Sequence, residues 1–226
     1  MGKVYHRYTF CPTLRKGTFM KRRFIQSLLV TSIALTLAAC ASGGAGTAET
    51  PDGDKIDLSG SPQGTVTADT SYGNLTGQNN EYSFYGLWQS RNGSEYELRY
   101  QGTAATDIPK SGKATYVGDA IWMGSVLGSY NQGGSTTLNV DFGQKTVDGK
   151  IAFSALNDLR SRDITLHKTQ LDGSKFSGKA SVLFNDGGTY EGALYGKGAP
   201  EAAGRVHFKD RADLDVVFGG KRSSVK

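Results

Sequence analysis

Cys40 is the residue whose type and setting most directly suggest chemistry. It follows a basic stretch, Lys21–Arg23, an apolar run from Phe24 to Leu37, and two alanines. A cationic start, a short apolar core and small residues at a cut site are the three parts of a bacterial secretion signal. The apolar run is shorter than the ~20 residues that a bilayer-spanning helix needs, so a retained transmembrane anchor is the weaker interpretation.

The stretch Leu37-Ala38-Ala39-Cys40 resembles the lipobox of bacterial lipoproteins. In those proteins a peptidase cuts just before the cysteine, whose thiol forms a thioether to diacylglycerol. The resemblance implies that residues 1–39 are a signal peptide and that Cys40 carries a lipid; the alternative is an ordinary signal peptide with a chance cysteine. Met20 begins a complete signal and is predicted to be the true start. Ala41, in place of an aspartate, favours the outer membrane.

The remaining residues able to do chemistry form no catalytic pattern. The other cysteine, Cys11, leaves with the signal peptide, which excludes a disulfide, a thiolate metal site and a cysteine nucleophile. No Ser-His-Asp order, metal-ligand spacing or phosphate-binding loop is present. We therefore expect a protein that is not an enzyme and has no metal site. Five carboxylates are predicted on outward strand positions and turns: Glu191, Glu201, Asp210, Asp213 and Asp215.

Two histidines, His167 and His207, follow the signal peptide. A single histidine can ligate haem iron, so a haem-binding carrier is one alternative function. Each histidine alternates with apolar neighbours, which predicts the outer face of a strand. The competing interpretation is therefore an exposed strand residue with no cofactor.

The formal charge of +5 is a property of the signal peptide. Residues 1–39 hold seven Lys and Arg and no acid, so their removal changes the net charge from +5 to −2. A near-neutral chain gives no electrostatic reason to expect nucleic acid as a partner. All but two of the 31 glycines follow residue 39 and alternate with β-branched and aromatic residues, which is typical of an all-β protein.

Three regions are predicted after the signal peptide. Residues 40–80 are polar and poor in large apolar side chains, which predicts a lipidated flexible tether; four apolar positions could add short strands, namely Ile56, Leu58, Val66 and Leu75. Residues 81–107 form a β-hairpin region, because Asn92-Gly93 separates two β-rich runs. Residues 108–222 form the last region, a β-barrel.

The barrel is predicted from eight short runs at even spacing. Each run has one apolar face, and closure into an antiparallel up-and-down barrel buries that face and removes the sheet edges. Most links are short and turn-like, including Asn185–Gly188. The eight runs are Lys113–Ile121, Thr136–Phe142, Val147–Phe153, Asp163–Lys168, Phe176–Val182, Thr189–Tyr195, Gly204–Phe208 and Leu214–Phe218. No long helix is expected, although Leu156–Arg160 could form one turn.

Two places offer candidate ligand-binding residues. In the hairpin region, Tyr85 and Trp88 are interface candidates, because aromatic residues are enriched at protein interfaces as well as in small β cores. The link Ile121–Tyr130 is the longest and most apolar in the barrel. It either binds a ligand or folds over the barrel end. Its candidates are Trp122, Met123, Leu127 and Tyr130.

The last third of the chain resembles the C-terminal barrel of the transferrin-binding protein B and factor H binding protein family of surface lipoproteins. The resemblance rests on Phe176-Ser177-Gly178, on the corner Tyr195-Gly196 to Glu201 and Gly204, and on Phe218-Gly219-Gly220-Lys221. It extends from Ile108 to Arg222, and it covers no part of residues 50–107.

The resemblance implies a lipoprotein displayed on the outer face of a Gram-negative outer membrane. It implies a host molecule as ligand, such as a serum protein or an iron source, and an outer-membrane export protein that recognises the barrel. A structural envelope lipoprotein facing the periplasm is the remaining alternative, because Cys40 alone permits either leaflet.

Overall fold

The computed structural model describes residues 44–123, 130–153 and 162–225. Cys40, Leu127 and the predicted turn Leu156–Arg160 lie outside the described residues. Within the described ranges, no helix is long and apolar enough to cross a membrane. Three β-sheets account for nearly all the regular structure, and one short 3-10 helix, η2 (Ala212–Leu214), interrupts them.

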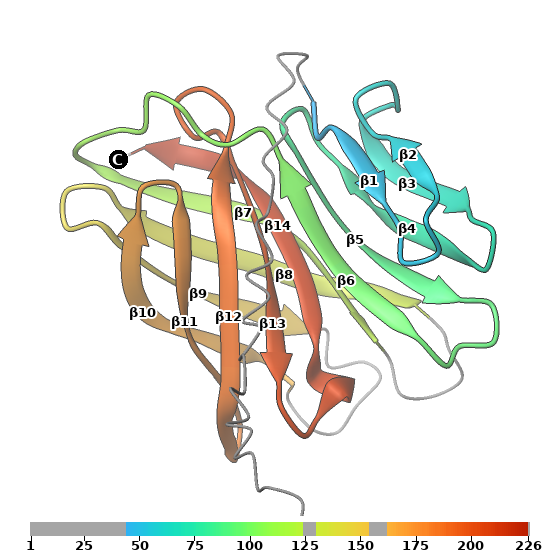
Figure 1. Ribbon diagram of the computed structural model, residues 1–226. Coiled ribbons are helices and arrows are strands. Elements are labelled where there is room, and N and C mark those ends of the chain that lie inside the picture. The colour runs from blue at the N-terminus through green and yellow to red at the C-terminus, as the bar shows by residue number, and fades with distance from the viewer. Residues whose placement is uncertain (1–43, 124–129, 154–161, 226) are drawn as a thin grey trace, which may run out of the picture. The chain divides into compact units, whose positions relative to one another are not determined.

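The largest sheet is a closed antiparallel barrel in which each strand pairs with its neighbours in sequence and the last strand pairs with the first (Figure 1). The eight-stranded up-and-down barrel is therefore confirmed. Its strands are β7 (Lys113–Met123), β8 (Tyr130–Asp141), β9 (Thr146–Phe153), β10 (Ile164–Asp172), β11 (Lys175–Val182), β12 (Asn185–Tyr195), β13 (Glu201–Phe208) and β14 (Val216–Val225).

Alternating side chains explain why these runs close into a barrel. In β8, Leu138 and Val140 are buried, whereas the alternating residues Thr137 and Asn139 are exposed. The same alternation in the other strands fills the interior with aliphatic and aromatic side chains, including Tyr116. Burial of apolar surface of this kind stabilises the fold by roughly 25 cal/mol per Å².

Two links differ from the sequence prediction. β7 and β8 run further than expected, so Trp122, Met123 and Tyr130 lie in strands, and Met123 pairs with Tyr130. The predicted turn Asn185–Gly188 instead belongs to β12. Gly188 is needed inside the barrel wall, because a Cβ there would lie 2.6 Å from the Phe208 ring.

A four-stranded antiparallel sheet precedes the barrel. Its strands are β3 (Gly64–Asp69), β4 (Gly73–Asn79), β5 (Ser83–Ser90) and β6 (Tyr96–Gly102), in that order across the sheet. The Asn-Gly hairpin is confirmed: β5 and β6 pair, and Gly93 in their turn has a φ of +70°. This positive φ is a conformation that glycine adopts without strain.

The short strands expected at Ile56, Val66 and Leu75 are confirmed, but the flexible tether predicted for residues 40–80 is wrong for residues 44–80. They form β1 (Thr47–Glu49), β2 (Lys55–Asp57), β3 and β4. The first two pair with each other and share a buried cluster with the four-stranded sheet. Few apolar side chains suffice here, because the cluster receives Phe84 and Trp88 from β5.

Hydrogen bonds to Asp52 also hold this part of the fold. The Thr50 and Thr70 hydroxyls donate to its carboxylate at 2.5 and 2.6 Å, and the Tyr72 amide donates at 2.8 Å. Burial alone would raise the pKa of Asp52, but these hydrogen bonds outweigh it and lower the pKa to about 2. The polar residues of this region, whose composition suggests disorder, therefore form hydrogen bonds that connect turns distant in the sequence.

Candidate functional site

The four-stranded sheet is sandwiched between the barrel and the β1–β2 pair, and this buries both aromatic candidates of β5. Tyr85 and Trp88 are each 2% exposed. Tyr85 belongs to the cluster between the sheet and the barrel, with Ile121 and Val217, whereas Trp88 lies in the cluster with β1 and β2. Neither side chain is an exposed interface residue, because each face of β5 is covered by another layer of the same chain. Tyr85 stays a candidate only where it lines the pocket described below.

A buried carboxylate at the start of β13 joins the barrel to the sheet. Glu201 is 3% exposed. It accepts hydrogen bonds from the amides of Glu81 and Tyr82 at 3.1 and 3.0 Å, and from the Ser83 hydroxyl at 2.7 Å. Hydrogen bonds to an ionised acceptor are stronger than neutral ones, so Glu201 fixes the start of β5 on the barrel.

A second carboxylate joins β6 to the barrel beside η2. Asp215, also 3% exposed, accepts hydrogen bonds from the Tyr96 hydroxyl at 3.1 Å, from His207 Nδ1 at 2.9 Å and from the Phe208 amide at 2.8 Å. Burial, and then the charge of Asp215, raises the pKa of Tyr96 to about 12.

The prediction of outward or turn positions is therefore wrong for Glu201 and Asp215. Their oxygens are used in structural hydrogen bonds to chain segments more than 100 positions away. Such long-range partners leave no local pattern in the sequence. Together the two carboxylates hold the sheet and the barrel in a fixed arrangement. This arrangement provides a rigid support for exposed side chains.

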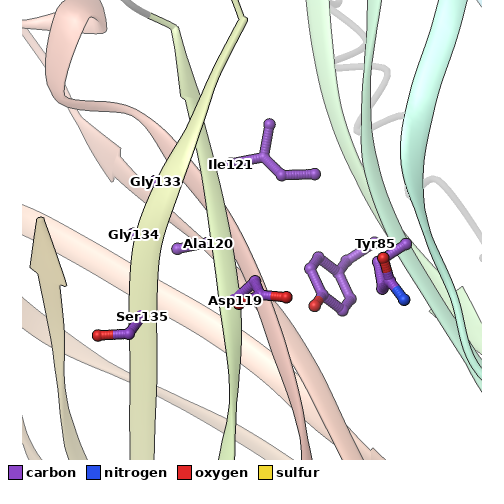
Figure 2. A pocket seen from close by; sticks show the side chains of 8 residues that line it. Tyr85, Asp119, Ala120, Ile121, Gly133, Gly134 and Ser135 are labelled. Carbon is purple, nitrogen blue, oxygen red and sulfur yellow. The ribbon is translucent and has the colours of Figure 1, made fainter. Parts of the chain in front are cut away.

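A polar pocket lies beside this junction (Figure 2). Its volume is about 320 Å³, at the small end of the range for ligand sites. It is lined by residues of β4, β5, β7 and β8: Gln78, Tyr85, Asp119, Ala120, Ile121, Gly133, Gly134 and Ser135. Figure 2 shows Tyr85 and Asp119 pointing toward one another across it.

Trp122 occupies the end of the barrel where β7 meets β8. Its side chain is partly buried against the barrel core, and its ring meets that of Phe153 edge-on, with centroids 5.7 Å apart. The Arg162 guanidinium lies over the same ring, 4.6 Å from its centroid. For Trp122 itself, the structure thus favours the alternative in which the side chain packs over the barrel end.

Among the described residues at this end, two exposed apolar side chains stand out that the sequence did not single out. Leu183 and Phe184 form the two-residue turn between β11 and β12, and they are 65% and 97% exposed. Phe184 has a φ of +64°. A bulky residue in this left-handed region is an outlier, because such turns usually carry glycine or asparagine. No sequence signal marks this turn, since the better turn former is the following Asn185–Gly188.

One end of the barrel collects the ends of β7, β9, β11 and β13 and the starts of β8, β10, β12 and β14, because neighbouring strands alternate in direction. In Figure 1 this is the lower end, where the β11–β12 hairpin and η2 are visible. We call this surface the turn end of the barrel, defined by Trp122, Phe153, Leu183 and Phe184.

The two histidines lie on the outer face of the barrel, as predicted. His167 on β10 contacts the Ser181 hydroxyl through Nε2 at 2.8 Å, and His207 on β13 is bound to Asp215. Their strands are separated by β11 and β12, so the two residues do not form a pair. Haem binding by either histidine stays a prediction.

Comparison with known proteins identifies a family model that matches the barrel region and relatives that match most of the chain. The neisserial heparin binding antigen of Neisseria meningitidis serogroup B strain MC58 is 30% identical over 176 residues, which cover 76% of this chain and 33% of that protein. The chain therefore spans about a third of the length of this relative. The solved structure of intact Ap-TbpB, with N and C lobes, has a TM-score of 0.57 and 28% identity, covering 81% of this chain and 43% of that one.

A further solved structure shares the fold over a comparable length. It is HpuA from Kingella denitrificans in complex with human haemoglobin, with a TM-score of 0.60, 19% identity, and coverage of 80% of this chain and 77% of that one. The family model of the C-lobe and N-lobe beta barrels of Tf-binding protein B matches residues 108–222, which are the segment leading into the barrel and the barrel itself up to the last residues of β14. The chain therefore belongs to the transferrin-binding protein B barrel family.

Proposed function

We propose that this protein is a lipoprotein of the outer-membrane surface that binds a host protein through the turn end of the barrel. The observation that carries the proposal is the pair Leu183 and Phe184, two large apolar side chains exposed on a turn. Exposed apolar groups of this size are typical anchors of protein interfaces, where a few buried side chains supply most of the binding energy.

The backbone at Phe184 supports a functional role for this turn. A non-glycine residue at a positive φ costs about 1 to 3 kcal/mol, and such strain is retained mostly where it serves binding or catalysis. Phe184 is 97% exposed, so packing inside the protein gives nothing to offset this cost. A partner that buries the ring would supply the compensation.

The relatives support a host molecule as the ligand. Their names and structures include a heparin binding antigen, a transferrin-binding protein B, and a protein crystallised with human haemoglobin. Binding to a partner is the property that they share, and none of these names describes catalysis. The buried carboxylates Glu201 and Asp215 serve the fold, which agrees with a binding protein rather than an enzyme.

Anchoring by Cys40 supports the location. The sequence Leu37–Cys40 provides a lipidation site, and Ala41 favours the outer membrane. Display on the outer face would require an export protein that recognises the barrel, and this partner is part of the proposal.

Protease treatment of intact cells, followed by capture from host serum, tests the proposal. A surface protein is digested on intact cells, whereas a periplasm-facing lipoprotein survives until the outer membrane is opened. The purified wild-type protein is expected to retain a serum protein that the Phe184→Gly variant retains weakly. Survival on intact cells would contradict surface display, and equal capture by both proteins would contradict binding through the turn end.

A further inference from the structure

The polar pocket between the sheet and the barrel is formed where the contact between these two layers ends. Over β5 and β6, the face of the sheet that meets the barrel is apolar and buried, with Tyr85, Leu87 and Leu98. On the next strand, β4, the residue paired with Tyr85 is Gln78, which is half-buried. The change from apolar to polar side chains leaves an accessible space between β4 and the outer wall of the barrel.

A bulge in the barrel wall shapes the other side of the pocket. The pairing of β7 with β8 shifts between Ala120 and Ile121, so Gly133 has no direct partner on β7. A Cβ at Gly133 would have no other atom within 4 Å. The bulge therefore adds open space to the pocket wall, and bulges of this kind are frequent beside functional sites.

One charge dominates the lining of the pocket. Asp119 is the only ionised residue among the eight that line it, and Ser135 is its direct neighbour across the strand pair. Among the described residues, no lysine, arginine or histidine forms a salt bridge with Asp119. The pocket thus presents a carboxylate together with the hydroxyl and amide oxygens of Tyr85, Ser135 and Gln78.

The titratable group facing Asp119 stays uncharged. Burial raises the pKa of the Tyr85 hydroxyl, and the negative charge of Asp119 raises it further. The Asp119 backbone lowers the pKa of this hydroxyl, but burial outweighs that effect. Tyr85 therefore contributes a neutral hydroxyl to the pocket, and the negative charge of the pocket comes from Asp119.

We propose that this pocket binds a ligand carrying an alkylammonium or guanidinium group, with Asp119 as the counterion and Gln78, Tyr85 and Ser135 as its neutral hydrogen-bonding partners. The pocket volume accommodates such a group on a short aliphatic chain. The alkylammonium or guanidinium group belongs either to a free small-molecule amine or to a lysine or arginine side chain of a bound protein. The site uses none of the residues that define the turn end, so it is independent of the function proposed above.

Titration of the full-length protein, purified in detergent, tests this site. The probes are putrescine and agmatine as free amines, Nα-acetyl-lysinamide and Nα-acetyl-argininamide as side-chain mimics, and 1,4-butanediol as a neutral probe. Binding is followed by the NMR shifts of the amides of Gly133, Gly134 and Ser135. The cationic probes are expected to move these signals, less so at high salt, and butanediol is expected to leave them in place.

Two variants test the assignment of the residues. Asp119→Asn keeps the shape of the side chain and removes its charge, so the affinity should fall about tenfold or more. Gly133→Leu fills the open space and should abolish binding. Asp172→Asn is the matched control, because Asp172 is an exposed carboxylate at the end of β10, and it should bind like the wild type.

Each outcome decides the proposal. Stronger binding of the free amines or of the side-chain mimics identifies the source, and either result supports the site. No shift with any cationic probe at millimolar concentration would overturn it. So would an Asp119→Asn protein that binds like the wild type, or equal losses in Asp119→Asn and Asp172→Asn. If Gly133→Leu fails to fold, Asp119→Asn alone decides.

Discussion

The Glu201 carboxylate accepts a 2.7 Å hydrogen bond from the hydroxyl of Ser83, which lies 118 positions earlier in the chain. The backbone amides of Glu81 and Tyr82, in the same segment, also donate hydrogen bonds to this carboxylate. One buried side chain of the barrel thereby orders the start of β5, and with it the edge at which the four-stranded sheet begins its contact with the barrel.

Glu201→Ala should destabilise the protein because it leaves the buried Ser83 hydroxyl and the partly buried amides of Glu81 and Tyr82 without an acceptor. We expect the free energy of unfolding to fall by about 3 kcal/mol in urea titration, with faster amide hydrogen exchange at Glu81–Ser83. Glu191→Ala is the control: Glu191 pairs with Arg205 on the surface, and its loss should cost less than about 1 kcal/mol. Equal stability of the two variants would show that Glu201 does not hold the junction.

Gly219→Ala should separate the sheet from the barrel by steric conflict. A Cβ at position 219 would lie 2.3 Å from two ring carbons of Tyr85, far inside van der Waals contact. We expect a loss of about 2 kcal/mol or more in the free energy of unfolding. Gly143→Ala, where the nearest atom is an Asp141 oxygen at 3.4 Å, should change stability by less than about 0.5 kcal/mol. A wild-type melting curve for Gly219→Ala would contradict the packing of Tyr85.

Acid should weaken the fold of residues 44–80 through Asp52. The pKa of its carboxyl is lowered from 3.8 to about 2 in the folded protein, so its stabilising effect is present above pH 4 and is lost as the pH falls toward 2. NMR titration of the Asp52 carboxyl measures the pKa directly. Asp52→Asn should be less stable than the wild type at neutral pH, and the difference should shrink in acid. A pKa near 4 would contradict the three hydrogen bonds.

Phe184→Gly should leave the protein at least as stable as before. Glycine adopts a positive φ freely, and removing a fully exposed ring costs no burial, so a gain of about 1 kcal/mol is expected by thermal or urea unfolding. Lys145→Gly, at a φ of +53° in the β8–β9 turn, should behave in the same way and serves as the control. Destabilisation by Phe184→Gly alone would mean that the ring packs within the protein.

The barrel and the β5–β6 hairpin could be predicted because their signals are local. Alternation marks each strand, and Asn92-Gly93 marks the turn. The tether prediction is wrong for residues 44–80 because their apolar partners, Phe84 and Trp88, come from later in the chain. A low local content of large side chains does not exclude strands that pack on a neighbouring sheet.

The candidate site could not be predicted for related reasons. Burial of Tyr85 depends on contact between two sheets, and burial of Glu201 depends on donors more than 100 positions away. The exposed turn at Phe184 was missed because Gly188 is used for packing against Phe208 and not for the turn. The exposure of Leu183 and Phe184 depends on the assembled barrel, so the local sequence does not indicate it.

The most direct test of the central claim is the affinity of the captured host protein for wild-type protein, Phe184→Gly and Lys145→Gly, measured side by side. If the turn end is the binding surface, Phe184→Gly should bind about thirtyfold more weakly or worse, as expected for the loss of an interface anchor, while Lys145→Gly should bind like the wild type. Equal affinity of all three proteins would contradict the assignment of host binding to this end of the barrel.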